Sequence, residues 1–172
     1  MIEFIIRIKL RDLGKMPIRS YRASDRETIK EITITCFGPT SSIDLNIETQ
    51  FGLTNGKDWT WRKQRQIEND INTNPAGIFA AEIDGKVVGY ITTQVDHESK
   101  IGSIPNLAVL PDRQQDGIGR ALVERALASF REQGMELARI ETLDSNAVGQ
   151  QFYPSCGFTE VARQIHYAMA MV

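Results

Sequence analysis

The segment from Leu107 to Leu122 constrains the fold of this chain more than any other segment. An apolar, strand-like run ends at Pro111, a short polar turn supplies Gly117 and Gly119, and an amphipathic helix pattern begins directly afterwards. A glycine-rich turn that leads into a helix presents several unpaired backbone N–H groups in one direction, and the helix dipole adds positive potential there. The segment therefore predicts a strand, a turn and a helix that together bind a phosphate or pyrophosphate.

Periodicity and turn residues extend this unit to a whole fold. The order β-α-α-β-β-β-α-β-α-β predicts an α/β (mixed α+β) architecture, a central and mostly antiparallel sheet flanked by helices. Asp84-Gly85 predicts a type I′ turn between two strands, and Ser24 with Glu27 predicts a capping box for the first helix. The expected strands are 18–22, 77–83, 86–95, 101–109, 137–143 and 158–169, and the expected helices are 25–37, 59–72 (capped by Asp58), 118–133 and 147–155, with at most a helical turn in 38–57.

Composition limits the classes of partner. The chain has 172 residues, 20 basic and 22 acidic side chains and a net charge of −2, which fits one domain without the basic excess that nucleic acid or anionic membranes require. We expect residues 1–15 to be an N-terminal extension or an extra edge strand, and 16–172 to be a single domain. Cys36 and Cys156 have no metal-ligand spacing, so we expect no metal site and a reducing, cytoplasmic location with two free thiols.

The identity of the phosphate ligand can be narrowed by what the turn lacks. A purely structural turn is the alternative to phosphate binding. A dinucleotide-binding fingerprint needs a third glycine where Leu122 stands, and a P-loop needs Gly-Lys-Ser/Thr, which this turn does not contain. The turn also follows an antiparallel meander and not the first strand of a βαβ unit. Neither nucleotide-binding pattern fits well.

Two motifs resemble those of the GNAT superfamily of N-acetyltransferases. The run Leu107-Ala-Val109 followed by Gln114-x-x-Gly117-x-Gly119 resembles its motif A, and Asn146 followed by Phe152-Tyr153 and Gly157-Phe158 resembles its motif B. One helix and one strand separate the two motifs, as in the family. The resemblance covers about residues 16–170.

The resemblance implies acetyl-CoA as the donor and assigns roles to individual residues. The backbones of Leu107 and Val109 would bind the pantetheine arm like an added strand. Tyr153 would protonate the departing thiolate of CoA, whereas its alternative role is that of a core or rim aromatic residue. The remaining residues implied to contact the cofactor are Gln114, Gln115, Asp116, Gly117, Ile118, Gly119 and Arg120 in the turn, and Asn146 downstream.

A general base is harder to assign. Many relatives place a glutamate just before the Leu-Ala-Val segment, but this chain has Ile104-Pro105-Asn106 there, and neither Pro105 nor Asn106 can accept a proton in that way. Glu141 and His166 are the other candidates. A water relay, or an amine that arrives neutral, would also suffice, and the base stays unassigned.

The acceptor side gives one further expectation. Aromatic and acidic residues gather in the region before and within the second predicted helix, where they would form a site for a cationic amine; the alternative is that the tryptophans only pack that helix onto the sheet. These residues are Phe51, Trp59 and Trp61 with Asp44, Glu48 and Asp58. Cys156 is expected to be a small buried residue and not a nucleophile.

The sequence therefore predicts an acetyl-CoA-dependent N-acetyltransferase that transfers the acetyl group directly to a primary amine on a small molecule or peptide. The alternative is a non-catalytic acyl-CoA-binding sensor or interaction module on the same fold. A nucleotide-binding oxidoreductase is the third possibility. A homodimer is possible through the last strand, and the identity of the amine stays open.

Overall fold

A five-stranded mixed sheet forms the centre of the molecule. The computed structural model describes residues 18–38 and 40–171, and its strands follow one another in the order β1-β2-β3-β4-β5. β1 to β4 pair antiparallel, and β5 pairs parallel with β4. The strands are β1 (Ile18–Ser20), β2 (Ile78–Ile83), β3 (Lys86–Asp96), β4 (Ile101–Val109) and β5 (Leu137–Ile140). The mixed α/β architecture predicted from the sequence is confirmed.

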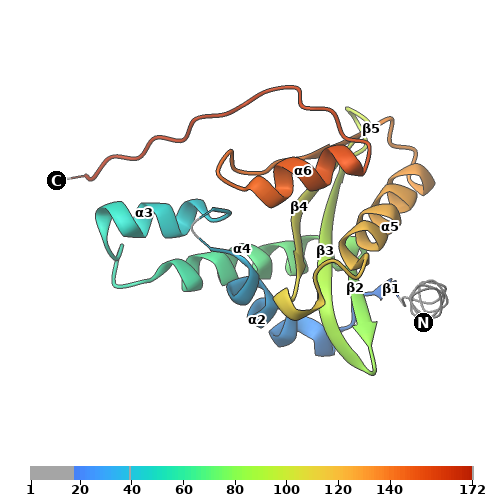
Figure 1. Ribbon diagram of the computed structural model, residues 1–172, viewed down its shortest axis with the longest axis horizontal. Helices are drawn as coiled ribbons and strands as arrows, with labels where there is room; N and C mark the ends of the chain where they lie inside the picture. The colour runs from blue at the N-terminus through green and yellow to red at the C-terminus, as the bar shows by residue number, and fades with distance from the viewer. Residues whose placement is uncertain (1–17, 39, 172) are drawn as a thin grey trace, which may run out of the picture.

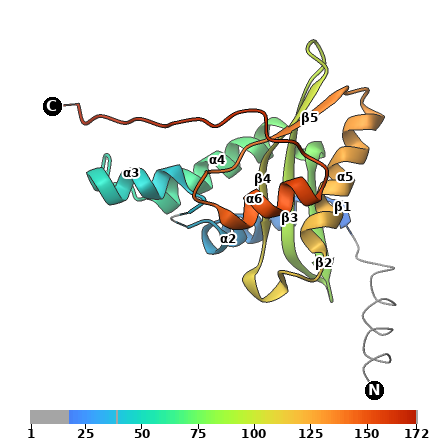
Figure 2. The ribbon, with the colours of Figure 1, turned by 45° about the horizontal axis from the view of Figure 1, so that its top comes forward.

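Helices cover both faces of this sheet (Figures 1 and 2). They are α2 (Arg26–Cys36), α3 (Ile43–Phe51), α4 (Trp59–Thr73), α5 (Ile118–Glu132) and α6 (Ala147–Ser155). Successive strand residues point to opposite faces, so Tyr90 joins the cluster of Ile29 and Ile67 under α2 and α4, whereas Ile91 joins the cluster of Leu122 under α5. The central strands are therefore buried on both sides.

Several local predictions are confirmed by backbone geometry. Asp84 and Gly85 have φ angles of 51° and 75°, as a type I′ turn requires. The Asp58 carboxylate accepts a hydrogen bond from the Trp61 N–H at 2.8 Å and caps α4. Gly134 follows α5 with a φ of 73°, the left-handed conformation that glycine adopts at helix ends.

Two predictions at the N-terminal half are wrong. Ser24 does not cap the first helix, because a 3₁₀ turn occupies Ala23–Asp25 and α2 begins after Asp25. The Asp25 carboxylate instead accepts the Arg22 N–H at 2.8 Å and pairs with Arg19. The predicted loop 38–57 contains the nine-residue helix α3, capped by the Ser42 side chain.

The final strand predicted for 158–169 is also absent from the described residues. The chain after α6 runs alongside the body without secondary structure (Figure 1), and β5 is shorter than predicted, ending at Ile140. Val161 and Tyr167 are 94% and 89% exposed. A strand forms only when a second strand supplies hydrogen-bond partners, and no described strand pairs with this segment.

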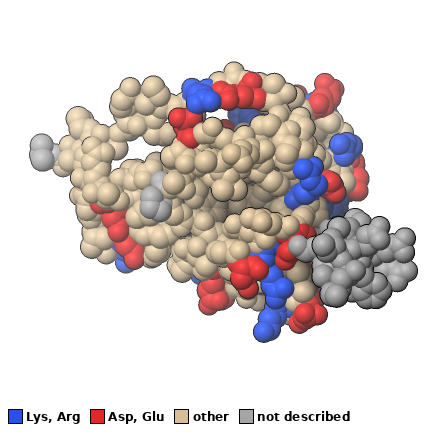
Figure 3. All heavy atoms as spheres, viewed as in Figure 1, with Lys and Arg blue, Asp and Glu red and all other residues tan. Residues whose placement is uncertain are grey.

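The expectation for residues 1–15 lies outside the described residues. None of the described helices is long and apolar enough to cross a membrane. Acidic and basic side chains lie mixed along the margin of the face shown in Figure 3, and its described residues form no broad basic patch. This distribution agrees with the net charge of −2.

Candidate active site

β4 separates from β5 halfway along its length. The two strands pair from Ile101 to Ile104, whereas β4 continues to Val109. At the same point Ile104 and Pro105 lie opposite the single residue Thr93 of β3. Such a bulge bends a strand and increases its twist. Residues 105–109 are therefore left with one backbone edge that no described strand pairs.

The alternation of backbone hydrogen bonds along β4 shows which of its residues face the gap left beside β5. The Leu110 N–H donates to the Val88 carbonyl at 2.9 Å, and in an antiparallel pair only every second residue bonds to the neighbouring strand. Leu107 and Val109 therefore direct their N–H and C=O groups away from β3. The Val109 carbonyl accepts hydrogen bonds from Cys36 Sγ at 3.3 Å and Gln114 Nε2 at 3.1 Å.

The turn that follows β4 gathers unpaired N–H groups at the start of α5. Gln115 and Gly117 have φ angles of 68° and 81°, and Gly117 is the N-cap of α5 without a side-chain cap. Within the described chain, the N–H groups of residues 115–120 donate no hydrogen bond to another protein group. These unpaired N–H groups and the positive end of a 15-residue helix make an anion site.

α6 lies against this turn. A Cβ atom on Gly119 would come within 3.3 Å of Phe152 Cζ, so glycine at this position lets the Phe152 ring pack on the first turn of α5. Glycine at position 119 is therefore also favoured by the packing of α6 on α5. Arg120 reaches the same helix, because its guanidinium donates to Ser155 Oγ at 3.1 Å.

This geometry invites comparison with known proteins. The model of the acetyltransferase (GNAT) family matches residues 43–158, more than half of the chain. The chain belongs to this family. The mycothiol acetyltransferase of Thermomonospora curvata is 33% identical over 109 residues, which are 63% of this chain and 36% of that protein. The chain thus matches only about a third of the length of this curated relative.

Two solved structures have a fold similar to that of this GNAT protein. Ard1 from Thermoplasma volcanium superposes with a TM-score of 0.62 and 25% identity, covering 85% of this chain and 84% of that one. Rv2747 from Mycobacterium tuberculosis in complex with CoA gives a TM-score of 0.58 and 25% identity, covering 85% and 73%. The architecture found here is therefore that of the GNAT family.

Tyr153 of this GNAT protein occupies an aromatic setting. Its ring makes edge-on contacts with Phe152 and Phe158, with centroid distances of 5.3 and 6.2 Å. Burial raises the pKa of Tyr153 to about 12, and the neighbouring Cys156 adds to the rise. A phenol with a raised pKa stays protonated at neutral pH, so the Tyr153 hydroxyl carries its proton there.

Asn146 caps α6 with its side chain. Its Oδ1 accepts the Gly149 N–H at 3.1 Å, and its Nδ2 donates to Thr142 Oγ1 at 2.9 Å. The side-chain oxygen is thus used within the protein, and one amide hydrogen is left for another acceptor. The predicted contact between Asn146 and the cofactor stays a prediction.

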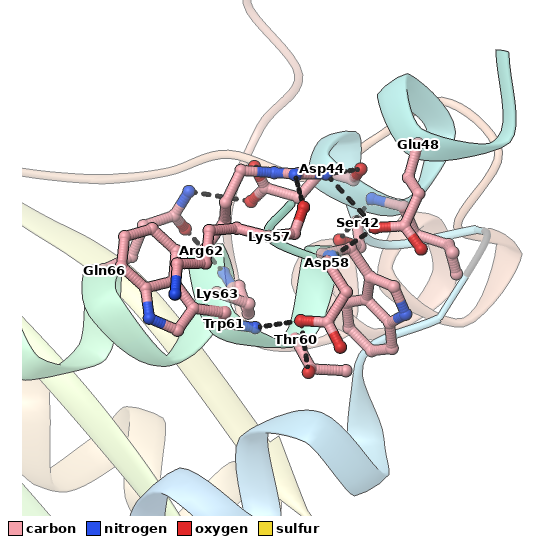
Figure 4. A network of polar contacts seen from close by, with 12 residues as sticks. Ser42, Asp44, Glu48, Lys57, Asp58, Thr60, Trp61, Arg62, Lys63 and Gln66 are labelled. Carbon is pink, nitrogen blue, oxygen red and sulfur yellow. Dashed lines mark hydrogen bonds and ion pairs between the residues drawn. The ribbon is translucent and has the colours of Figure 1, made fainter. Parts of the chain in front are cut away.

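The acidic residues predicted to attract a cationic amine are used inside the protein (Figure 4). The Arg62 guanidinium lies 3.4 Å from Asp44 Oδ1 and 3.4 Å from Glu48 Oε2, and Glu48 also accepts the Trp59 N–H. Asp58 is occupied by the cap of α4. These contacts fasten α3 to α4, so the carboxylates have a structural role. Trp61 is 41% exposed, and Lys57 lies over its ring at 5.3 Å.

The surroundings of Glu141 and His166 do not support either residue as the general base. The Glu141 side chain is 72% exposed and lies 3.7 Å from Arg139. His166 lies in the exposed segment after α6. The described residues contain no group of three or more histidine, cysteine, aspartate or glutamate side chains that could hold a metal ion.

One polar cluster escaped the sequence interpretation. Lys63 and Asp70 of α4 meet Asn106 of β4, with Lys63 Nζ at 2.9 Å from Asn106 Oδ1 and Asp70 Oδ2 at 2.8 Å from Asn106 Nδ2. The sequence pattern could have indicated this cluster, because Lys63 and Asp70 lie on the same helical face as the apolar residue Ile67. Charged residues on an apolar face indicate buried polar partners.

Proposed function

We propose that this GNAT protein is an acetyl-CoA-dependent N-acetyltransferase that transfers the acetyl group directly to a primary amine. The observation that carries the proposal is the open edge of β4. Leu107 and Val109 direct backbone polar groups into the gap beside β5, and the N–H groups of the adjoining turn form an anion site. The first feature suits the amide groups of pantetheine, and the second suits a pyrophosphate.

The turn before α5 contributes backbone N–H groups to the proposed acetyl-CoA site. We assign the pyrophosphate to the backbone N–H groups of residues 115–120, since the Gln114 N–H donates to the Pro111 carbonyl, and a peripheral contact to Asn146. Asp112, Arg113, Asp116 and Arg120 sum to no net charge. Attraction for the phosphates therefore comes from oriented N–H groups and the helix dipole more than from side-chain charge.

The chemical step needs few protein groups. The neutral amine attacks the thioester carbonyl carbon, a C–N bond forms, and a β4 backbone N–H stabilises the oxyanion. The C–S bond then breaks, and Tyr153 donates its proton to the departing thiolate. The amine loses its proton to solvent water, and Tyr153 regains one from the same source, so the protein returns to its starting state.

The donor can be tested by thermal unfolding. A ligand that binds only the native state stabilises it by about 2.7 kcal/mol at 100 times its Kd. Acetyl-CoA is therefore expected to raise the melting temperature by several degrees, and NAD(P) is expected to leave it unchanged. A rise with NAD(P) and none with acetyl-CoA would favour the oxidoreductase alternative.

The acceptor is a primary amine on a small molecule or a peptide. Similarity to mycothiol acetyltransferases puts mycothiol-type acceptors into the amine panel beside polyamines, amino acids, aminoglycosides and peptide N-termini. We place the reaction in the cytoplasm, because Cys36 and Cys156 are both free thiols and a reducing compartment preserves them.

We further propose a homodimer formed through the segment 158–171. Its apolar residues alternate with small or polar ones, and Ile165, Tyr167 and Met169 are 73%, 89% and 77% exposed. The outer edge of β5 pairs with no described strand and offers free backbone groups to the segment of a second copy. Sedimentation equilibrium should give a dimer for the full chain and a monomer after truncation at Thr159; a full chain that is monomeric at all concentrations would exclude this pairing.

A further inference from the structure

The cluster of Lys63, Asn106 and Asp70 lies where β4 leaves β5. The Lys63 side chain is buried under the sheet, with its ammonium 3.2 Å from Gln66 Oε1 and 4.1 Å from the centre of the Phe37 ring. Figure 4 shows Lys63 and Gln66 beside the ion network of α3 and α4. Burying an ammonium group costs free energy unless it is paired, and the shorter of its two hydrogen bonds, at 2.9 Å, goes to Asn106 Oδ1.

Hydrogen-bond chemistry fixes the orientation of the Asn106 amide. Lysine can only donate and an ionised aspartate can only accept, so Oδ1 must face Lys63 and Nδ2 must face Asp70. Thr92 completes the cluster, because its hydroxyl donates to Asp70 Oδ2 and accepts the Asn106 N–H, both at 3.1 Å. Asn106 is thus held on both ends of its side chain and at its main chain.

The position of Asn106 gives this arrangement a consequence for the site. Asn106 follows the bulge residues Ile104 and Pro105 and precedes Leu107, the first residue that turns its backbone into the gap. A rotation of the chain at Asn106 would redirect the polar groups of Leu107. Because a misplacement of about 1 Å can cost about 100-fold in rate, the hold on Asn106 bears on catalysis.

We propose that Lys63 and Asp70 are positioning residues, which act through Asn106 to hold the opened stretch of β4 in the register that aligns the acetyl group for attack. This inference rests on the proposed function. Burial lowers the pKa of Lys63 and raises that of Asp70, as expected for two charges that are set into the core from one helix. Neither residue transfers a proton in this account.

The test compares Lys63→Met, Asp70→Asn and the double variant in steady-state acetyl transfer. Each single change should lower kcat by about 10- to 100-fold. The KM for acetyl-CoA should rise by a smaller factor, because only the Leu107 contact to pantetheine is disturbed and the pyrophosphate site is untouched. The double variant removes both buried charges, so it should recover melting temperature relative to the single variants while kcat stays low. Recovery of kcat together with stability would overturn the proposal.

The matched control is Glu68→Gln on the same helix. Glu68 pairs with Arg26 of α2 and makes no hydrogen bond or ion pair with a described residue of β4, so this variant should lose stability only and keep kcat. If the variants of Lys63 and Asp70 fail to fold, Thr92→Val takes their place. Valine has the shape of threonine but lacks its hydroxyl, so this variant should also lower kcat.

The outcomes separate the two proposals. If acetyl-CoA does not stabilise the wild-type protein, the proposed function fails. If the wild type binds and turns over acetyl-CoA but the variants of Lys63, Asp70 and Thr92 keep the wild-type kcat and KM, the positioning role fails and the cluster only stabilises the core.

Discussion

Replacing Tyr153 with phenylalanine is expected to lower kcat by about 10²- to 10⁴-fold, the range that a general acid contributes. Phenylalanine keeps the ring that contacts Phe152 and Phe158 at centroid distances of 5.3 and 6.2 Å, so the fold and the binding of acetyl-CoA should persist. Only the phenolic proton is lost. The measurement is release of free CoA thiol under saturating acetyl-CoA and amine.

Tyr167→Phe is the control for this change, because Tyr167 is 89% exposed and has no assigned role in catalysis. Its kcat should equal that of the wild type. The pH dependence adds a second check. The proposed acid is the neutral form of Tyr153. Because the pKa of Tyr153 is raised to about 12, its deprotonation should cause no loss of rate until the pH approaches that value. Unaltered turnover of Tyr153→Phe across pH would show that the assigned acid is wrong.

Replacing Val109 with proline is expected to weaken acetyl-CoA binding by about tenfold or more. Proline has no N–H, and its ring would project into the gap that the Val109 N–H faces. Loss of one hydrogen bond costs about 1 kcal/mol, and occlusion of the gap adds to it. The pairing of β4 with β3 should survive, since Val109 does not direct its N–H toward β3. Isothermal titration calorimetry measures the affinity.

Val109→Ala separates the backbone effect from lost packing. Alanine retains the N–H and removes two methyl groups from the core contact of Val109, so it should lower the melting temperature and leave the affinity near that of the wild type. Equal affinities for the proline variant and the wild type would place the pantetheine arm elsewhere.

Much of the fold follows from local sequence patterns. The Asp84-Gly85 turn and the cap of Asp58 were predictable because short-range backbone chemistry decides both. The helix α3 was not, because tertiary contacts from Arg62 to Asp44 and Glu48 hold it in place. The final strand was overpredicted for the converse reason: Val161 and Tyr167 have a strand-like spacing, but no described strand pairs with them.

The candidate site, like the fold, is only partly predictable from the sequence. The turn at Gly117 is readable from sequence, because a positive φ at the start of a helix favours glycine. The gap beside Leu107 is not, since it depends on where β4 and β5 stop pairing. The acidic residues Asp44 and Glu48 suggested an amine site, and only the structure shows that Arg62 already uses them.

The activity proposed for this protein is the movement of an acetyl group from CoA to an amine. The most direct measurement is release of free thiol from acetyl-CoA in the presence of each amine class, with mass spectrometry of the acceptor. Thiol should appear only when a suitable amine is present and in equal amount with the acetylated amine. Binding of acetyl-CoA without acetylation of any amine would exclude transferase activity toward these amines and favour the acyl-CoA sensor.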